Sequence, residues 1–128
     1  MRSARWIAGM VLGGLLVGAA GPVQAGQDPV KVGPTIYTKV FENEKVRISN
    51  IKFKPGDSIP MHIHPDHVLY VLTPGKLVLS YPDGKSSDFE GKTGDVAWIN
   101  AESHAAVNTG TTEFNAVVVE LKPLPAYE

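Results

Sequence analysis

Residues 56–64 read Gly-Asp-Ser-Ile-Pro-Met-His-Ile-His and end in two histidines, His62 and His64, two positions apart. On a β-strand, side chains two positions apart point to the same face, because the pleat alternates. The chain has four histidines, and His104 stands far downstream, where a second strand can bring it against the pair. Three neutral imidazoles from two strands suit a divalent transition metal that keeps open coordination positions. The stretch therefore predicts a metal site inside a small β-barrel.

The sequence around this stretch consists of short β-forming runs separated by turn residues. Groups such as Pro55-Gly56-Asp57 and Pro82-Asp83-Gly84 indicate tight turns. Strands that recur about every ten residues, with no helical period between them, are typical of an all-β sandwich or barrel. Trp98 and Phe114 are expected to fill its core or line a pocket, and residues 26–34 to form a loosely held extended arm. The expected strands cover residues 35–41, 45–53, 61–64, 68–72, 76–81, 86–89, 96–99, 105–107 and 114–121.

The first 25 residues have the layout of a secretory signal peptide. Two arginines precede an uncharged run over residues 6–20, and Val23 and Ala25 are small residues placed as before a cleavage site. The run is shorter than the roughly 20 residues needed to span a bilayer. We therefore expect residues 1–25 to be a cleavable signal peptide, with an uncleaved N-terminal anchor as the alternative. Residues 26–128 are expected to form one domain and to be exported without stable membrane insertion.

Composition narrows the classes of partner. The chain carries 12 Lys and Arg residues against 13 Asp and Glu residues, without a basic run. This balance makes nucleic acid and anionic membrane surfaces poor candidate partners and leaves a small molecule as the expected ligand or substrate. The chain has no cysteine, so an exported domain of this kind must gain its stability from packing rather than from disulfides.

The spacing of glycines and histidines resembles the two motifs of the cupin superfamily, in particular its small single-domain bacterial members. The positions that match are Gly56, His62, His64 and Gly75 for the first motif, and Gly94, His104 and Asn108 for the second. The resemblance covers about residues 45–122 and implies a double-stranded β-helix, which is a jelly-roll barrel. It also implies a homodimer that pairs through its sheets and, together with the leader, a location in the bacterial periplasm.

This sequence departs from the motifs at three points. Val68 stands where the first motif has an acidic or amide ligand, so one oxygen ligand is missing. Asn100 and Glu102 replace the proline and the glycine of the second motif, and the loop before His104 is one residue shorter. Because cupin dioxygenases with three-histidine sites exist, the resemblance still implies that His104 and the His62–His64 pair bind a metal.

For other residues near the first motif, the sequence indicates a functional role less specifically. His67 is expected to point away from the barrel interior, with a fourth metal ligand or a partner that orients another histidine as alternatives. From Val68 onward, alternate residues are expected to face inward, which makes Tyr70 a core residue or a donor near the substrate. Asp66 and Glu102 are the acids closest to the motif, and each is either a general base or a solvated loop carboxylate.

Three imidazoles without a carboxylate leave a site of charge +2, which favours an anionic or chelating guest. Iron, zinc, nickel and copper accept imidazole ligands, whereas magnesium and calcium prefer oxygen. Two classes of function follow. One is a metal-dependent enzyme, dioxygenase-like or isomerase-like, that acts on a small organic acid. The other is a non-catalytic protein that binds or senses a small ligand or a metal, and a metal-free structural barrel is a third interpretation.

Overall fold

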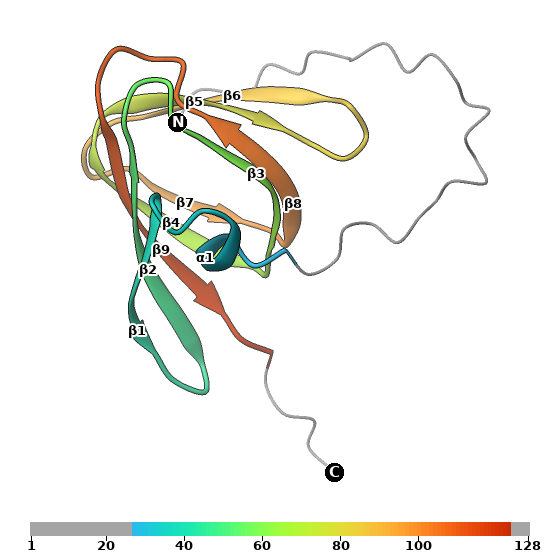
Figure 1. Cartoon of the computed structure of the whole chain (residues 1–128). Coiled ribbons are helices and arrows are strands. Elements are labelled where there is room, and N and C mark those ends of the chain that lie inside the picture. The colour runs from blue at the N-terminus through green and yellow to red at the C-terminus, as the bar shows by residue number, and fades with distance from the viewer. Residues whose placement is uncertain (1–26, 124–128) are drawn as a thin grey trace, which may run out of the picture.

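The computed structural model describes residues 27–123, so the predicted signal peptide lies outside the described residues. Two antiparallel sheets face each other and close into a barrel (Figure 1). Each of the nine predicted strands is present within a few residues of its expected range, which confirms the all-β prediction. The elements are α1 (Pro29–Val32), β1 (Tyr37–Glu42), β2 (Val46–Phe53), β3 (Ser58–His64), β4 (His67–Thr73), β5 (Gly75–Ser80), β6 (Ser86–Gly91), β7 (Val96–Ile99), β8 (Glu102–Val107) and β9 (Phe114–Leu121).

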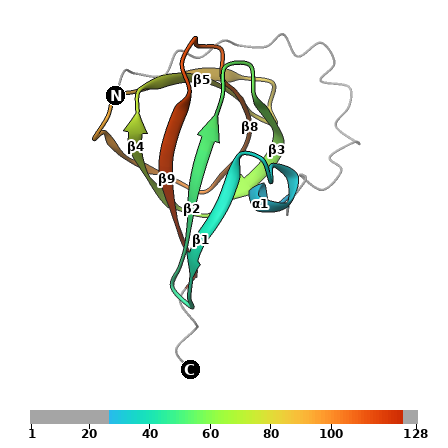
Figure 2. The ribbon, with the colours of Figure 1, turned by 60° about the vertical axis from the view of Figure 1, so that its left-hand side comes forward.

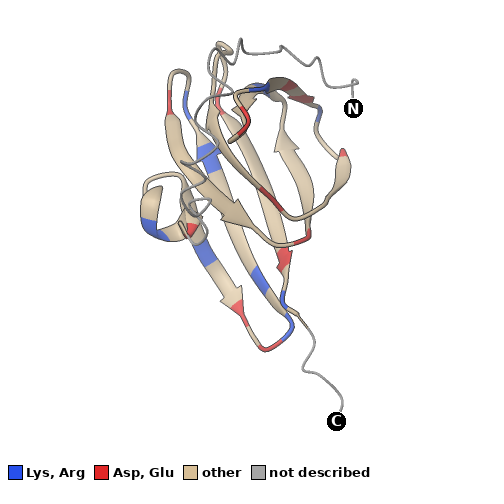
Figure 3. Ribbon diagram, turned by 90° about the vertical axis from the view of Figure 1, so that its right-hand side faces the viewer, with Lys and Arg blue, Asp and Glu red and all other residues tan. Residues whose placement is uncertain are grey.

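The order of the strands brings distant parts of the sequence together. The five-stranded sheet has the order β1-β2-β9-β4-β7, and the four-stranded sheet has the order β3-β8-β5-β6. Figure 2 shows β1, β2, β9 and β4 side by side. Strand β9, close to the end of the described chain, therefore lies between β2 and β4 at the centre of its sheet. Acidic and basic residues are interspersed along the ribbon in Figure 3.

The barrel interior changes from apolar to polar along its length. On β9 the inward residues Phe114, Ala116 and Val118 are buried, and the next inward residue is the equally buried Glu120. On β4, the register places His67 opposite Glu120 and places Val71 opposite Ala116. One end of the barrel interior is therefore lined by apolar side chains, and the opposite end holds the buried Glu120 and His67.

The prediction of which β4 side chains face the barrel interior is wrong by one residue. His67, Leu69 and Val71 point into the barrel, whereas Tyr70 is 44% exposed and Val68 is only half-buried. Only two residues separate β3 from β4, so the inward-facing side chains of β4 begin at His67, one position earlier than the predicted start at Val68. Since a strand has a side-chain period of two, this shift turns every side chain of β4 to the other face.

Two further expectations also need correction. Trp98 is 55% exposed and lies opposite Val68 on the outer face of the sheet, not in the core. The expected loose arm contains the short helix α1, whose N-cap Asp28 accepts a hydrogen bond from the backbone of Val30. The segment is held on β3, because the backbone N–H of Ile63 donates to Gln27 at 2.9 Å. Within residues 27–123, no helix is long and apolar enough to cross a membrane.

Strand β1 forms one edge of its sheet, and its hairpin with β2 extends beyond the rest of the barrel (Figure 1). The register with β2 shifts between Lys39 and Phe41, so Val40 is an extra residue that forms a β-bulge. Beyond the bulge, Phe41 pairs with Ile48, whose side chain lies on the outer face of the sheet.

We expect Asn108→Ala to destabilise the protein by about 2 to 4 kcal/mol, because it removes several buried hydrogen bonds at once. The Asn108 side chain donates to the carbonyls of Phe53 and Thr112 and accepts from the backbone of Gly110. Urea unfolding measures the change. Asn50→Ala, at an exposed position of β2, is the matched control and is expected to stay within about 0.5 kcal/mol. An equal effect of the two substitutions would contradict this account.

Candidate metal centre

The four histidines of the chain gather inside the polar end of the barrel. His62 and His64 come from β3, His67 from β4 and His104 from β8, and each is at most 6% exposed. His62 lies directly opposite His104 in the pairing of β3 with β8. His62, His64 and His104 each have one ring nitrogen that lies within 4.8 Å of the corresponding nitrogens of the other two. The structure thus brings together the three histidines that the sequence selected, despite the shortened loop before His104.

Hydrogen bonds fix which nitrogen carries the proton in the rings of His62, His64 and His67. The Nδ1 atoms of His62 and His67 lie 2.8 Å from the carbonyl oxygens of Pro60 and Pro65. A carbonyl can only accept, so in each neutral ring Nδ1 bears the hydrogen and Nε2 keeps its lone pair. The Nε2 atom of His62 is buried without a hydrogen-bond partner. This buried lone pair accepts no hydrogen bond and can therefore bind a metal.

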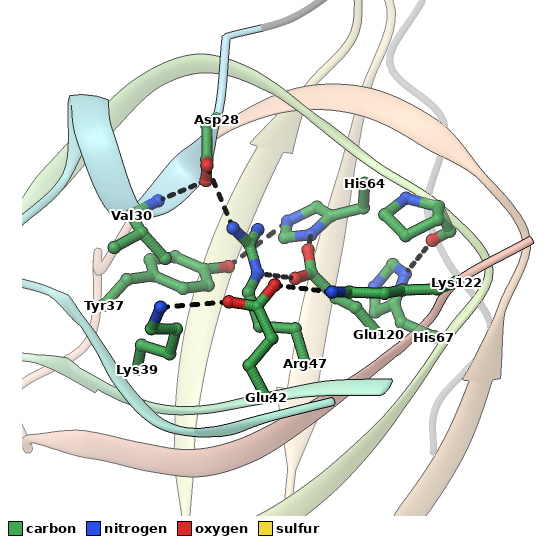
Figure 4. Close-up of polar contacts among 11 residues, drawn as sticks. Asp28, Val30, Tyr37, Lys39, Glu42, Arg47, His64, His67, Glu120 and Lys122 are labelled. Atoms are coloured by element: carbon green, nitrogen blue, oxygen red, sulfur yellow. Dashed lines mark hydrogen bonds and ion pairs between the residues drawn. The ribbon is translucent and has the colours of Figure 1, made fainter. Parts of the chain in front are cut away.

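His64 is oriented by a carboxylate from the far strand β9. Its Nδ1 donates to Glu120 Oε1 at 2.8 Å. Glu120 also accepts from Arg47 Nε at 2.6 Å, and Arg47 Nη1 donates to Asp28 at 2.9 Å. Figure 4 shows Arg47 between the two carboxylates and His64 beyond Glu120. Carboxylates that hold a histidine ligand in this way fix its tautomer and raise its basicity.

Burial keeps the imidazoles neutral. It lowers the pKa of His62 to about 3 and that of His64 to about 4, and it also lowers the pKa of His67. Burial alone would raise the pKa of Glu120, but hydrogen bonds from His64 and Arg47 outweigh this effect and lower it. At neutral pH the centre therefore combines neutral His62, His64 and His67 with an ionised, charge-compensated carboxylate. Neutral imidazole is the form that binds a metal.

Tyr37 completes the polar cluster from β1. Its hydroxyl lies 3.2 Å from His64 Nε2, and its ring contacts those of His62 and His64. Burial, with a further contribution from the Glu120 charge, raises the pKa of Tyr37, so its hydroxyl keeps the proton. Sequence reasoning missed Tyr37, Arg47 and Glu120. For Glu120 a signal existed, because it continues the inward alternation of Phe114, Ala116 and Val118.

A cavity of about 50 Å³ adjoins the histidines. His64, His67, His104 and Tyr37 form its polar part, and the remaining lining is apolar. A space of this size accommodates a few water-sized groups. A small guest with one polar end and an apolar body matches this lining.

The other residues that the sequence analysis selected lie at different positions relative to the histidine cluster. The prediction that His67 points outward is wrong, because its ring lies 4.6 Å from that of His64 and lines the cavity. Tyr70 and Val68, expected to face inward, lie on the outer side of β4 and do not reach the centre. Glu102 Oε2 lies 3.5 Å from His104 Nδ1. Asp66 accepts a hydrogen bond from the backbone of Ala101 and so holds the turn before β8.

The two facing sheets and the histidines gathered at one end place this chain among the small double-stranded β-helix barrels. The Cupin domain family model matches residues 49–120, and the chain belongs to this family. A cupin domain from Bordetella pertussis Tohama I is 31% identical, with a TM-score of 0.63, and the match covers 69% of this chain and 93% of that one.

A protein with a double-stranded β-helix domain from Klebsiella pneumoniae is 26% identical, with a TM-score of 0.55, and the match covers 67% of this chain and 75% of that one. A cupin superfamily protein from Desulfitobacterium hafniense, at 20% identity and a TM-score of 0.52 over 69% and 77% of the two chains, shares the fold. No curated protein matches this chain. These comparisons confirm the resemblance and the jelly-roll fold that it implied.

We expect the metal-free protein to lose stability as the pH falls below about 6.5, where histidines of an unfolded chain take up protons. Folded His62 and His64 resist protonation until about pH 3 and 4. The unfolded state therefore binds more protons in this window, and each histidine contributes a slope of up to about 1.4 kcal/mol per pH unit. Urea unfolding between about pH 5 and pH 7 measures the slope.

The control for this pH dependence is His62→Gln, which removes one buried titrating group and should flatten the slope. Glu120 does not interfere in this range, because its pKa lies below its ordinary value of 4.5. A slope that is the same in both proteins would show that His62 is not protected from protonation in the folded state.

Proposed function

We propose that this cupin binds one divalent transition metal through His62, His64 and His104 and acts on a small organic acid that the metal holds. The observation that carries the proposal is the buried, unpartnered Nε2 of His62 beside two further imidazoles. The donor set fits such a metal, because all its members are imidazole nitrogens, which iron, zinc, nickel and copper accept as ligands. Three ligands leave coordination positions free for a guest.

When bound, such a metal supplies Lewis-acid polarisation of the guest or, for a redox-active ion, activation of dioxygen. The protein's own residues provide the remaining functions. Glu120 holds His64 in one orientation, and the apolar wall of the cavity, which includes Leu77 and Phe114, limits the access of water. Glu102, next to His104, is the carboxylate available to move a proton at the edge of the centre.

A non-catalytic binding or sensing protein is the second candidate function. It is favoured by the cavity lining, which among the described residues contains no aspartate or glutamate. Glu120 is already engaged by two hydrogen-bond donors and is a poor general base. The metal-loaded protein should be incubated with a panel of small carboxylic acids, with and without dioxygen, and the acids followed by mass spectrometry. Metal-dependent product supports the enzyme, whereas a rise in melting temperature with unchanged acid supports the binding protein.

Export to the bacterial periplasm is part of the proposal and rests on the composition of residues 1–25. Secretion of the full-length chain with loss of residues 1–25, measured by mass spectrometry of the periplasmic fraction, tests it. Retention of those residues on a membrane-bound protein would favour the uncleaved anchor.

We also propose that two copies pair through the outer face of the five-stranded sheet. An apolar row crosses all five strands in register, through Phe41, Ile48, Val119, Val68 and Trp98. Phe41 and Trp98, at its two ends, are 51% and 55% exposed. Two copies of a face that carries such a row can cover each other around a two-fold axis, and exposed apolar surface of this kind commonly marks an interface.

We expect His64→Ala to abolish stoichiometric metal binding and Glu120→Gln to weaken it by about 10- to 100-fold, since Glu120 orients a ligand without binding the metal. The metal content of tag-free protein after incubation with iron, zinc, nickel and copper, followed by titration, measures both effects. Tyr70→Phe, on the outer face, is the matched control and should bind like the wild type. Absence of metal from the wild type would overturn the proposal and leave a metal-free ligand-binding cupin.

We expect the protein to elute with twice its chain mass in size-exclusion chromatography with light scattering, and Trp98→Asp to convert it to a monomer. The substitution places a charge in the apolar row, whose burial would then be costly. Lys85→Glu, in the exposed hairpin turn between β5 and β6, is the control and should leave the mass unchanged. A monomeric wild type would rule out pairing through this face.

A further inference from the structure

Tyr37 reaches the metal centre from outside the matched family region and from outside both sequence motifs. It is the first residue of β1, it is 6% exposed, and its hydroxyl lies 3.2 Å from His64 Nε2. Figure 4 shows the phenol pointing from β1 toward the His64 ring. Its neighbours in the cavity lining include the apolar side chains of Ile51 and Val118.

The proton in this hydrogen bond belongs to the phenol. His64 uses its single ring hydrogen, on Nδ1, to donate to Glu120 at 2.8 Å. The Nε2 atom of the neutral ring can then only accept, so the Tyr37 hydroxyl must donate to it.

One nitrogen lone pair cannot bind a metal and accept a hydrogen bond at the same time. The Nε2 atom of His64 has one lone pair, and the Tyr37 hydroxyl engages it from the side that a metal would approach. Metal binding at His64 must therefore break this hydrogen bond. The released hydroxyl would be a buried donor inside a mostly apolar cavity, where an unsatisfied donor is costly.

We propose that Tyr37 competes with the metal for His64 and that, once displaced, it donates its hydroxyl to an oxygen atom of the guest bound beside the metal. This inference rests on the proposed metal binding and adds a guest-recognition residue to it. It defines the preferred guest as one that presents a carboxylate or similar oxygen acceptor next to the metal. It also couples the two binding events, because a guest that accepts from Tyr37 removes the cost of displacing it.

The test compares the wild type with Tyr37→Phe, which removes the hydroxyl and keeps the ring. Zn(II) affinity is measured by competition with a chromophoric chelator, and Co(II) absorption reports the ligand environment. Without a guest, Tyr37→Phe should bind either ion about five- to tenfold more tightly, since no hydrogen bond must be broken. Acetate should raise the metal affinity of the wild type, and its effect in Tyr37→Phe should be several-fold smaller.

Tyr70→Phe removes the hydroxyl of an exposed tyrosine and should match the wild type in both measurements. Equal or weaker metal affinity in Tyr37→Phe, or an acetate effect that is the same in both proteins, would overturn the role of Tyr37. If His64→Ala loses the metal while Tyr37→Phe binds like the wild type, metal binding stands and the role of Tyr37 fails. If the wild type binds neither Zn(II) nor Co(II), the metal-binding proposal fails, and the role of Tyr37 fails with it.

Discussion

A buried carboxylate constrains the organisation of this barrel. Glu120 is 3% exposed and ionised, and an isolated charge in such a place would be prohibitively costly. Arg47 and His64 remove this cost by hydrogen bonding to its two oxygens. The same contacts join β9 to β2 and to β3, so the hydrogen bond of neutral His64 to Glu120 links the two sheets at the polar end of the barrel. Removing one partner of such a network is expected to cost more than the network itself contributes, because the remaining charge stays buried.

The geometry of the histidine cluster depends on this network. Glu120 determines the tautomer of His64, and that tautomer directs a lone pair at the Tyr37 hydroxyl and into the cavity. Arg47 in turn holds Asp28, which caps α1, so the segment before β1 is fixed to the same network. The centre of a small barrel is thus assembled from residues 28 to 120, far beyond the two motifs that identify the family.

Much of the fold and of the histidine cluster could be predicted from local sequence. Turn residues and apolar alternation locate the strands, and the His62–His64 pair with His104 depends only on strand periodicity and family spacing. The phase of β4 was mispredicted, because a turn one residue shorter than assumed exchanges the faces of His67 and Val68. Arg47 and Tyr37 could not be found, since their roles arise from the pairing of β1, β2 and β9, which no local pattern specifies.

The bulge at Val40 has a consequence for how copies of the protein can meet. An unbroken edge strand offers its free N–H and C=O groups to any other strand, and this is a common route to aggregation. The extra residue in β1 interrupts that row of groups and increases the local twist, so an incoming strand cannot pair along its whole length. Lys39 and Glu42, which form an ion pair close to the bulge, add charges at the same edge. For a chain without cysteine, which can form no disulfide, this edge is a safeguard against uncontrolled strand addition and fibre formation.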